Sequence, residues 1–309
     1  MKKIVIVGGG NGSAVVINAL KPYREDLALS AIISTCDSGG SSGKIREEFD
    51  VLPPGDLLRA VLAMSMHEYA VLKDIFYQKR FADRGKLNSH NVGNLFLALA
   101  ANFDGNMINA LRALEDAVSA VGHVYPMTLE SSDLCVSLTD GSTITGEHMV
   151  DRPTYDRSKK IVRTWLQPTP MIFAGAKQAV EEADVVLLGP GTLYGSIIPN
   201  LLVDGMKEAL EKTNAKVYFI LGNSFEAVGE TGPETIAGAV SALRTFLPKP
   251  LDGVIYNNSS VVAMYKGGER RLLTDDSASL AVKVMKEDLG DVEGLMDTKK
   301  LGIFLKTIL

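Results

Sequence analysis

The fold is decided by the stretch Lys3-Ile4-Val5-Ile6-Val7-Gly8-Gly9-Gly10-Asn11-Gly12-Ser13. Ile4–Val7 is a short β-branched run, which is typical of a strand buried on both faces. Ser13–Leu20 has the apolar spacing of a helix and ends before Pro22. Leu29–Ser34 is a second such strand, so the chain opens with a strand–helix–strand unit. A right-handed crossover makes these two strands parallel neighbours in one sheet.

The same alternation returns further along the chain. Further buried strands are expected at Val185–Leu188, Val217–Leu221 and Gly253–Tyr256. Helices are expected at Asp56–Met66 (with Asp56 as N-cap), Val71–Arg80, Val92–Ala101, Met107–Val118, Gly175–Ala183, Leu201–Glu211 and Pro233–Leu247. This order predicts an α/β fold: a Rossmann-like, doubly wound, mostly parallel sheet with helices on both faces, three layers in all.

The periodicity changes in the middle of the chain. Short strand-like runs occur at Val124–Met127, Leu134–Leu138, Thr143–Glu147 and Ile161–Leu166, and Asp140-Gly141 is a hairpin turn dipeptide between two of them. We therefore expect residues 121–166 to form an antiparallel β-rich excursion within a single domain of residues 1–309. No internal repeat, Ser/Pro-rich linker or low-complexity tract interrupts the sequence.

Composition excludes several classes of protein. The 32 basic and 37 acidic residues give a net charge of −5, and Lys and Arg form only short groups such as Arg157–Lys160, so no nucleic-acid partner is expected. No apolar run reaches the length that inserts into a membrane, which predicts a soluble, cytoplasmic protein. Cys36 and Cys135 are too few for a disulfide framework and are expected to be reduced thiols.

The 29 glycines collect where predicted strands end. After the first strand, Gly9, Gly10, Asn11 and Gly12 allow a tight turn in which backbone N–H groups approach an anion at the helix start. The spacing departs from G-x-G-x-x-G because Ser13 occupies the last glycine position, and no Lys-Ser/Thr pair of a P-loop follows. A tight turn without a ligand is the alternative interpretation.

A second loop follows the second strand. It contains Asp37, an acidic residue where dinucleotide-binding folds bind ribose hydroxyls, and then a run rich in N–H and hydroxyl donors. That run comprises Gly39, Gly40, Ser41, Ser42 and Gly43, with Lys44 and Arg46 directly after it. Such a nest favours anions, and arginine can bind phosphate oxygens in a bidentate manner. A flexible polar loop is the alternative.

Three further segments place polar groups at the same edge of the sheet. Asp56 and Arg59 follow Pro54-Gly55, and Asp56 is either a simple helix cap or a carboxylate for Mg²⁺ or a ligand hydroxyl. His90, Asn91 and Asn94 exceed what helix capping needs, which suggests a ligand-facing helix terminus. Late strands are followed by Gly189, Gly191, Thr192, Tyr194 and Asn223. No Ser-His-Asp triad can be assigned, so the pattern predicts binding of a phosphorylated, hydroxyl-rich ligand.

Together these segments resemble the CofD-like family, in particular its YvcK branch, the gluconeogenesis factors. The resemblance runs nearly end to end and is carried by Gly8–Gly12, Asp37–Gly43, Pro54–Asp56, His90–Leu95, Gly189–Tyr194, Ser196–Leu202 and Gly229–Gly232. Asn11 and Ser38 stand where the family usually has Thr and a second Asp, and Gly195 replaces a usual Thr. The Asp-His pair that usually follows Gly232 is also missing.

The resemblance implies a Rossmann-like three-layer core and a cytoplasmic protein. For the YvcK branch it implies binding of UDP-sugars such as UDP-N-acetylglucosamine, and a role in cell shape and wall synthesis during gluconeogenic growth. For the CofD branch it implies transfer of a phospholactyl group from a lactyl-diphospho-guanosine donor to a deazaflavin, with Mg²⁺.

Three hypotheses follow, in decreasing order of support. In the first, a nucleotide-sugar-binding regulator holds the diphosphate on the amides of Gly9–Gly12 and Gly40–Gly43, Lys44, Arg46 and Arg59 offset its charge, and Asp37 or Asn91 binds hydroxyls. In the second, a transferase uses Asp37 and Asp56 to hold Mg²⁺ on the nucleotide diphosphate. A nicotinamide oxidoreductase is third, because its fingerprint is broken at Ser13. Assembly into a homo-oligomer stays open.

Overall fold

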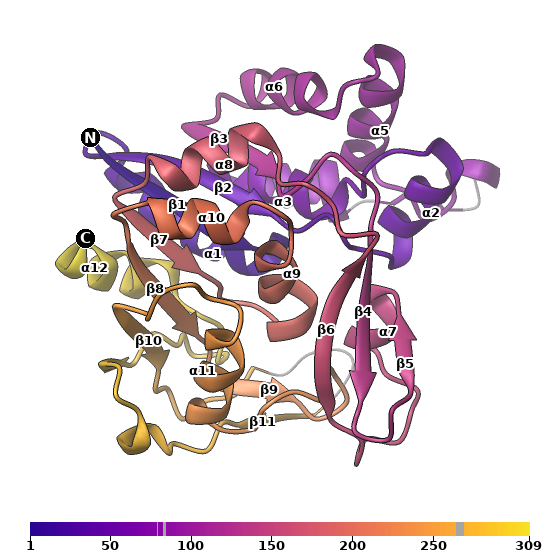
Figure 1. Ribbon diagram of the computed structural model, residues 1–309. Helices are drawn as coiled ribbons and strands as arrows, with labels where there is room; N and C mark the ends of the chain where they lie inside the picture. Colours follow the sequence, from indigo (N-terminus) through magenta and orange to yellow (C-terminus); the bar gives the residue numbers. More distant parts are fainter. Residues whose placement is uncertain (79, 83–84, 264–268) are drawn as a thin grey trace.

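The computed structural model describes residues 1–78, 80–82, 85–263 and 269–309. Its centre is a seven-stranded sheet in the order β3-β2-β1-β7-β8-β10-β12, in which every neighbouring pair is parallel (Figure 1). The strands are β1 (Lys2–Gly8), β2 (Leu27–Ile33), β3 (Gly122–Pro126), β7 (Val185–Leu188), β8 (Lys216–Leu221), β10 (Gly253–Asn257) and β12 (Val284–Glu287). The predicted Rossmann-like parallel sheet is confirmed.

The direction of strand addition reverses beside β1. From β1 the chain adds β2 and β3 on one side and then β7, β8, β10 and β12 on the other, so β1 has β2 and β7 as neighbours. This reversal is the topological switch point of a doubly wound sheet, where loops diverge and leave a crevice outside the strand ends. The glycine-rich loops after β1, β2 and β7 therefore surround that point.

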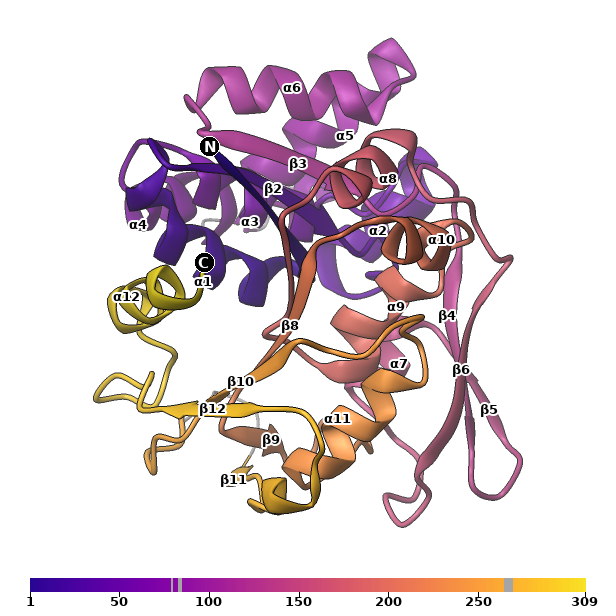
Figure 2. The same ribbon diagram turned by 60° about the vertical axis from the view of Figure 1, so that its left-hand side comes forward.

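Side chains on β1 alternate between two cores. Ile4 and Ile6 belong to a core with α1 (Gly10–Leu20), α3 (Gly55–Met64), α6 (Met107–Ala117) and α12 (Thr298–Ile308). Val5 and Val7 belong to the opposite core, with α8 (Ala174–Glu181), α9 (Ile198–Leu201), α10 (Met206–Lys212) and α11 (Ile236–Arg244). Figure 2 shows the two helical layers on either side of the sheet. The three-layer prediction is thereby confirmed.

A smaller antiparallel sheet extends from one side of the molecule (Figure 1). It has the order β5-β4-β6, formed by β4 (Asp133–Leu138), β5 (Thr143–Thr145) and β6 (Ile161–Gln167), with the turn at Asp140-Gly141 as predicted. The short helix α7 (Glu147–Asp151) follows β5. Leu134, Val136 and Leu138 pack into the core that contains Val5 and Val7. A further antiparallel pair joins β9 (Ser224–Glu226) to β11 (Arg270–Leu272).

The expected excursion over residues 121–166 is wrong at its first strand. The predicted run Val124–Met127 is largely β3, which pairs in parallel with β2 at the edge of the main sheet. The hydrophobic pattern of this run gave the wrong prediction because an edge strand of a parallel sheet is short and half-buried, like a strand of an antiparallel sheet. The antiparallel sheet therefore begins at β4.

Several helices also differ from expectation. Residues 40–49 form α2 (Gly40–Phe49), where a loop was expected. Asp56 is not the N-cap of α3, because α3 begins at Gly55 after Pro54 and Asp56 lies inside its first turn. The predicted helix Leu201–Glu211 is split between α9 and α10, since Gly205 adopts φ +97° between them.

The remaining helical segments lie around this frame. In place of the expected helix at Val71–Arg80 the structure has α4 (Tyr69–Lys73) and a π-helical turn (Asp74–Gln78), and position 79 lies outside the described residues. The helix predicted at Val92–Ala101 is α5 (Val92–Asp104). Single turns occur at Lys21–Tyr23, Gly85–Leu87 and Ser277–Ser279. Within the described ranges, none of the helices has the length and apolarity needed to cross a membrane.

Candidate functional site

The loop after β1 packs closely against two other loops at the switch point. A Cβ atom at Gly12 would overlap the carbonyl oxygen of Pro190, in the loop after β7. A Cβ atom at Gly10 would lie 2.5 Å from Oδ1 of Asp56, at the start of α3. Only glycine leaves room for these approaches. Glycines identified in the sequence analysis therefore allow the loop after β1, the loop after β7 and the start of α3 to pack together at the switch point.

The helices that follow β1 and β2 both begin without a side-chain cap. The N-caps of α1 and α2 are Gly9 and Gly39. The short helices α7 and α10 also begin on uncapped glycines, whereas α5, α6, α11 and α12 begin on Asn, Thr or Asp side chains that accept a helix N–H. The first intrahelical bonds run from Ser13 N to Gly9 O and from Gly43 N to Gly39 O. The N–H groups of residues 10–12 and 40–42 therefore have no acceptor within their own helix. Helix starts of this kind attract anions.

Carboxylates from three elements gather beside these helix starts. Asp37 follows β2 and accepts the Gly39 N–H at 2.9 Å; burial, and then the charge of Asp56, raise the pKa of Asp37. Glu147 on α7 is largely buried, and burial together with Asp37, Asp151 and Asp56 raises its pKa to about 9. Glu147 was missed at the level of sequence because it reaches the site from α7, the helix that follows the antiparallel strand β5.

Asp37 and Asp56 were predicted to hold a metal ion. Across the described part of the chain, no group of three or more His, Cys, Asp or Glu side chains could hold one by itself. Mg²⁺, however, is usually held by one or two carboxylates together with substrate phosphates and water. Asp37 and Asp56 are two partly buried, mutually repelling carboxylates beside two uncapped helix starts, and they would hold a Mg²⁺ ion together with the phosphates of a bound ligand.

The basic residues predicted to offset phosphate charge have different surroundings. Arg59 Nη1 lies 3.0 Å from Asp56 Oδ1, and its guanidinium lies 4.3 Å from the centre of the Tyr77 ring. Arg46 pairs with Asp133. Lys44 is exposed on α2, and no ion pair of it is seen among the described residues. Two of the three cations are thus partly neutralised by carboxylates of the protein.

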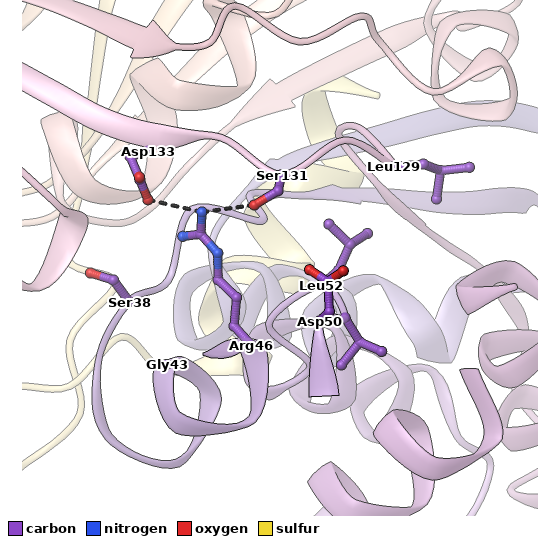
Figure 3. Close-up of a pocket in the computed structure, with 9 residues that line it drawn as sticks. Ser38, Gly43, Arg46, Asp50, Leu52, Leu129, Ser131 and Asp133 are labelled. Atoms are coloured by element: carbon purple, nitrogen blue, oxygen red, sulfur yellow. Dashed lines mark hydrogen bonds and ion pairs between the residues drawn. The ribbon is translucent and has the colours of Figure 1, made fainter. Parts of the chain in front are cut away.

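Arg46 lies at the edge of a cavity of about 470 Å³ beside α2 (Figure 3). Its Nη2 atom donates to Ser131 Oγ at 3.0 Å and to Ser132 O at 3.2 Å, and lies 2.8 Å from Asp133 Oδ1. The cavity is lined by Ser38, Gly43, Arg46, Asp50, Val51, Leu52, Leu129, Ser131 and Asp133. It therefore adjoins the second glycine loop through Ser38 and Gly43.

The polar start of α5 contacts the start of α2. Ser41 Oγ lies 2.9 Å from His90 Nδ1 and accepts a hydrogen bond from Asn94 Nδ2 at 3.2 Å. Asn91 caps α5, its Oδ1 accepting the Asn94 N–H at 2.7 Å. All four side chains are buried, and Asn91 Nδ2 and Asn94 Oδ1 have no partner among the described residues. Capping thus explains one Asn91 atom and leaves these two amide atoms unexplained.

The loop after β7 already binds an anion, and that anion belongs to the protein. The carboxylate of Glu230 accepts hydrogen bonds from the backbone N–H groups of Leu193, Tyr194 and Gly195 at 2.6, 2.9 and 3.1 Å. Thr192 Oγ1 lies 2.9 Å from Ser196 Oγ. The amides that follow Thr192 are therefore engaged internally. Glu230 lies between β9 and α11, within the Gly229–Gly232 segment that carries the family resemblance, but its role as the partner of these amides was not predicted.

The other predicted residues on this rim have structural surroundings. Gly189 and Gly191 adopt φ +81° and +159°, and a Cβ atom at Gly189 would lie 2.9 Å from the Ile220 carbonyl oxygen. Asn223 is buried and its Nδ2 donates to the carbonyl oxygens of Ser259 at 3.0 Å and Val261 at 2.6 Å. Both amide hydrogens of Asn223 are thus used to hold the segment after β10.

A doubly wound sheet with glycine-rich loops at its switch point defines a Rossmann-like class of α/β protein. The chain belongs to the CofD family: the family model described as 2-phospho-L-lactate transferase CofD matches residues 4–290. The resemblance inferred from the motifs is thereby confirmed.

Individual relatives and solved structures agree with this assignment. The chain is 35% identical over 261 residues to the gluconeogenesis factor of Listeria innocua, covering 84% of this chain and 78% of the relative. It is 34% identical over 255 residues to a putative gluconeogenesis factor of Thermotoga maritima, covering 82% and 78%. A crystal structure of a UPF0052 family member from Bacillus halodurans superposes with a TM-score of 0.88 at 26% identity, covering 99% of this chain and 98% of that one.

Proposed function

We propose that the protein binds a nucleotide sugar, a UDP-sugar such as UDP-N-acetylglucosamine, across the switch point between β1 and β7. The observation that carries the proposal is the pair of uncapped, glycine-started helices α1 and α2 at one edge of the sheet. Two adjacent helix starts of this kind match the two linked phosphates of a nucleotide diphosphate.

The electrostatics of the site add a condition to this proposal. A diphosphate at the starts of α1 and α2 would lie beside the carboxylates of Asp37 and Asp56, and like charges at short distance repel. Asp37 and Asp56 would hold Mg²⁺, whose charge would offset that of the phosphates, or ligand hydroxyls would donate to Asp37. We therefore expect Mg²⁺ to strengthen binding of the diphosphate.

A regulatory role is proposed on the strength of the relatives. Proteins that share about a third of their residues with this chain are named gluconeogenesis factors. We propose that ligand binding here serves cell shape and wall synthesis during gluconeogenic growth.

The alternative is a CofD-type transfer of a phospholactyl group from a guanosine diphospho donor to a deazaflavin. The observation that favours it is the carboxylate group of Asp37, Asp56 and Glu147, which exceeds what ligand binding requires. Mg²⁺ held by Asp37 and Asp56 would stabilise charge on the departing phosphate. In that case Glu147, with its raised pKa, would carry a proton near neutral pH close to the diphosphate.

Thermal unfolding with a panel of ligands separates these functions. A ligand present at 100 times its dissociation constant stabilises the folded state by about 2.7 kcal/mol. We expect UDP-N-acetylglucosamine to stabilise the protein, more strongly with Mg²⁺, and to be recovered unchanged. Stabilisation by guanine nucleotides with Mg²⁺ alone would favour the transferase, and a response to NADH alone would eliminate both.

A pair of variants localises the ligand. Asp37→Asn should weaken the Mg²⁺-dependent part of UDP-N-acetylglucosamine binding at least tenfold, because it removes one of the two carboxylates that would hold Mg²⁺. Asp116→Asn on the exposed side of α6 is the matched control and should bind like the parent protein. Equal affinities of the parent, Asp37→Asn and Asp116→Asn proteins would place the ligand elsewhere.

A further inference from the structure

We infer that the cavity beside α2 receives the base and ribose of the nucleotide, so that Arg46 contacts the nucleoside and not the diphosphate. This inference rests on the proposed function. It assigns the nucleoside end of the ligand to the β2 side of β1 and the sugar end to the β7 side. It replaces the sequence-based hypothesis in which Arg46 offsets phosphate charge.

The position of the cavity in the fold is the first argument. Its lining comes from the loop after β2, from α2 and the chain that follows it, and from the segment between β3 and β4. In doubly wound folds the diphosphate lies at the helix start after β1, and an acidic residue near the end of β2 binds the ribose. Asp37 follows β2, and its neighbour Ser38 lines the cavity. A ribose at Asp37 would therefore direct its base into this space.

The chemistry of the lining is the second argument. Val51, Leu52 and Leu129 supply apolar surface, and Leu129 keeps 45% of its surface exposed. Arg46, Asp133 and Ser131 supply donors and an acceptor (Figure 3). A nucleobase needs this combination, because its faces are apolar while its edge carries hydrogen-bonding groups. The volume of about 470 Å³ also lies within the range of small-molecule sites and far exceeds what a phosphate needs.

The anchoring of Arg46 is the third argument. One terminal nitrogen, Nη2, makes the contacts with Ser131, Ser132 and Asp133, which fixes the plane of the guanidinium. A fixed planar guanidinium stacks well on a heterocycle. Its charge is balanced by the Asp133 carboxylate at 2.8 Å, so its attraction for a second anion is reduced. Arg46 is thus better suited to a neutral base than to phosphate.

Calorimetric titration of the whole chain with pyrophosphate, UDP and GDP in the presence of Mg²⁺ tests the assignment. We expect one of the nucleotides to bind at least tenfold more tightly than pyrophosphate. Leu129→Trp should fill the cavity and lower that nucleotide's affinity at least tenfold, with pyrophosphate affinity unchanged. Leu272→Trp on β11 is the control, because Leu272 has the same 45% exposure far from α2.

A second variant examines Arg46 directly. Arg46→Met keeps much of the aliphatic chain and should lower nucleotide affinity while pyrophosphate affinity stays unchanged. A parallel loss of pyrophosphate affinity would make Arg46 a phosphate ligand and overturn the inference, while the proposed function would stand. The inference also fails if the parent protein binds UDP, GDP and pyrophosphate equally. If the parent protein binds none of the three probes or UDP-N-acetylglucosamine, the proposed function itself fails.

Discussion

The carboxylate of Glu230 accepts a hydrogen bond from the backbone N–H of Tyr194 at 2.9 Å, and the neighbouring N–H groups of Leu193 and Gly195 bind the same carboxylate. The segment between β9 and α11 is thereby tied to the loop after β7 at the switch point. Tyr155 Oη, 2.9 Å from Thr231 Oγ1, ties the same segment to the chain between α7 and β6. Glu230 and Thr231 thus link the loop after β7 to the chain before β6.

Stability should fall as pH rises through the titration of Glu230. Burial raises the pKa of Glu230 from 4.5 to about 7, although three N–H bonds act to lower it. Between these two values the folded carboxyl keeps a proton that the unfolded chain has released, so the free energy of unfolding declines with rising pH. Urea unfolding of the parent protein and of Glu230→Gln at pH values between about 4.5 and 7.5 measures this.

The Glu230→Gln protein should show a flatter pH dependence than the parent, because the titrating group is gone. The matched control is Glu234→Gln, which removes an exposed carboxylate paired with Lys160 at 2.9 Å. Parent-like pH dependence in Glu230→Gln would show that other carboxylates dominate.

Gly12→Ala should destabilise the protein. The added methyl group would overlap the Pro190 carbonyl oxygen, which is backbone and has no other rotamer to adopt. Forced overpacking of this kind costs about 1–3 kcal/mol. Gly222→Ala is the control, since no atom lies within 4 Å of the added Cβ there. Denaturant unfolding of both variants measures the difference, and a parent-like Gly12→Ala protein would mean that the loops after β1 and β7 separate easily.

Much of the fold was predictable because its central strands are continuous apolar runs. Val185–Leu188 was predicted to the residue, and β1, β2, β8 and β10 to within a few residues. The start of α2 was not, because its glycines and serines are poor helix formers and the helix depends on packing against α5. β12 lies in a stretch with no clear period, and its place in the sheet follows from pairing with β10.

The site was predictable where backbone geometry demands glycine, and unpredictable where charge arrives from elsewhere in the chain. Gly10 and Gly12 were identified because another segment packs closely against the backbone there, which requires glycine, and a cluster of glycines is visible in the sequence. Glu147 has no such sequence signal, since an isolated glutamate is ordinarily a solvated surface residue. Glu230 lies in the Gly229–Gly232 motif, but the motif does not indicate the backbone amides that the carboxylate binds. The partners of Arg46 and Arg59 likewise depend on tertiary contacts, and these pairings changed the role expected for both side chains.

Arg59→Met should destabilise the folded protein and increase its response to Mg²⁺. Arg59 balances Asp56, whose charge also raises the pKa of Asp37. Without Arg59 the carboxylates of Asp37 and Asp56 repel each other. Since the Arg59 and Asp56 side chains are each about one-fifth exposed, we expect the free energy of unfolding to fall by about 1–3 kcal/mol near pH 8. Millimolar Mg²⁺ should restore more stability to this variant than to the parent. The exposed Arg244→Met on α11 is the control, and equal Mg²⁺ responses would argue against a cation at Asp37 and Asp56.

Asn91 offers a way to separate helix capping from ligand binding. Its Oδ1 caps α5 by accepting the Asn94 N–H at 2.7 Å, whereas its Nδ2 is buried without a partner in the part of the chain described. Asn91→Ala removes both atoms and should cost about 1 kcal/mol of stability, as should Asn106→Ala at the cap of α6. Asn91→Ser keeps a capping oxygen and lacks the amide nitrogen.

We therefore expect Asn91→Ser to unfold at nearly the parent denaturant concentration. If Nδ2 donates to a bound nucleotide sugar, the same variant should bind UDP-N-acetylglucosamine about tenfold more weakly, because a lost hydrogen bond in a buried site costs about 1–2 kcal/mol. Asn106→Ala should keep parent affinity despite its lower stability. Should Asn91→Ser bind with parent affinity, the unpaired amide has no part in recognition, and the cluster around Ser41 and His90 serves to hold the starts of α2 and α5 together.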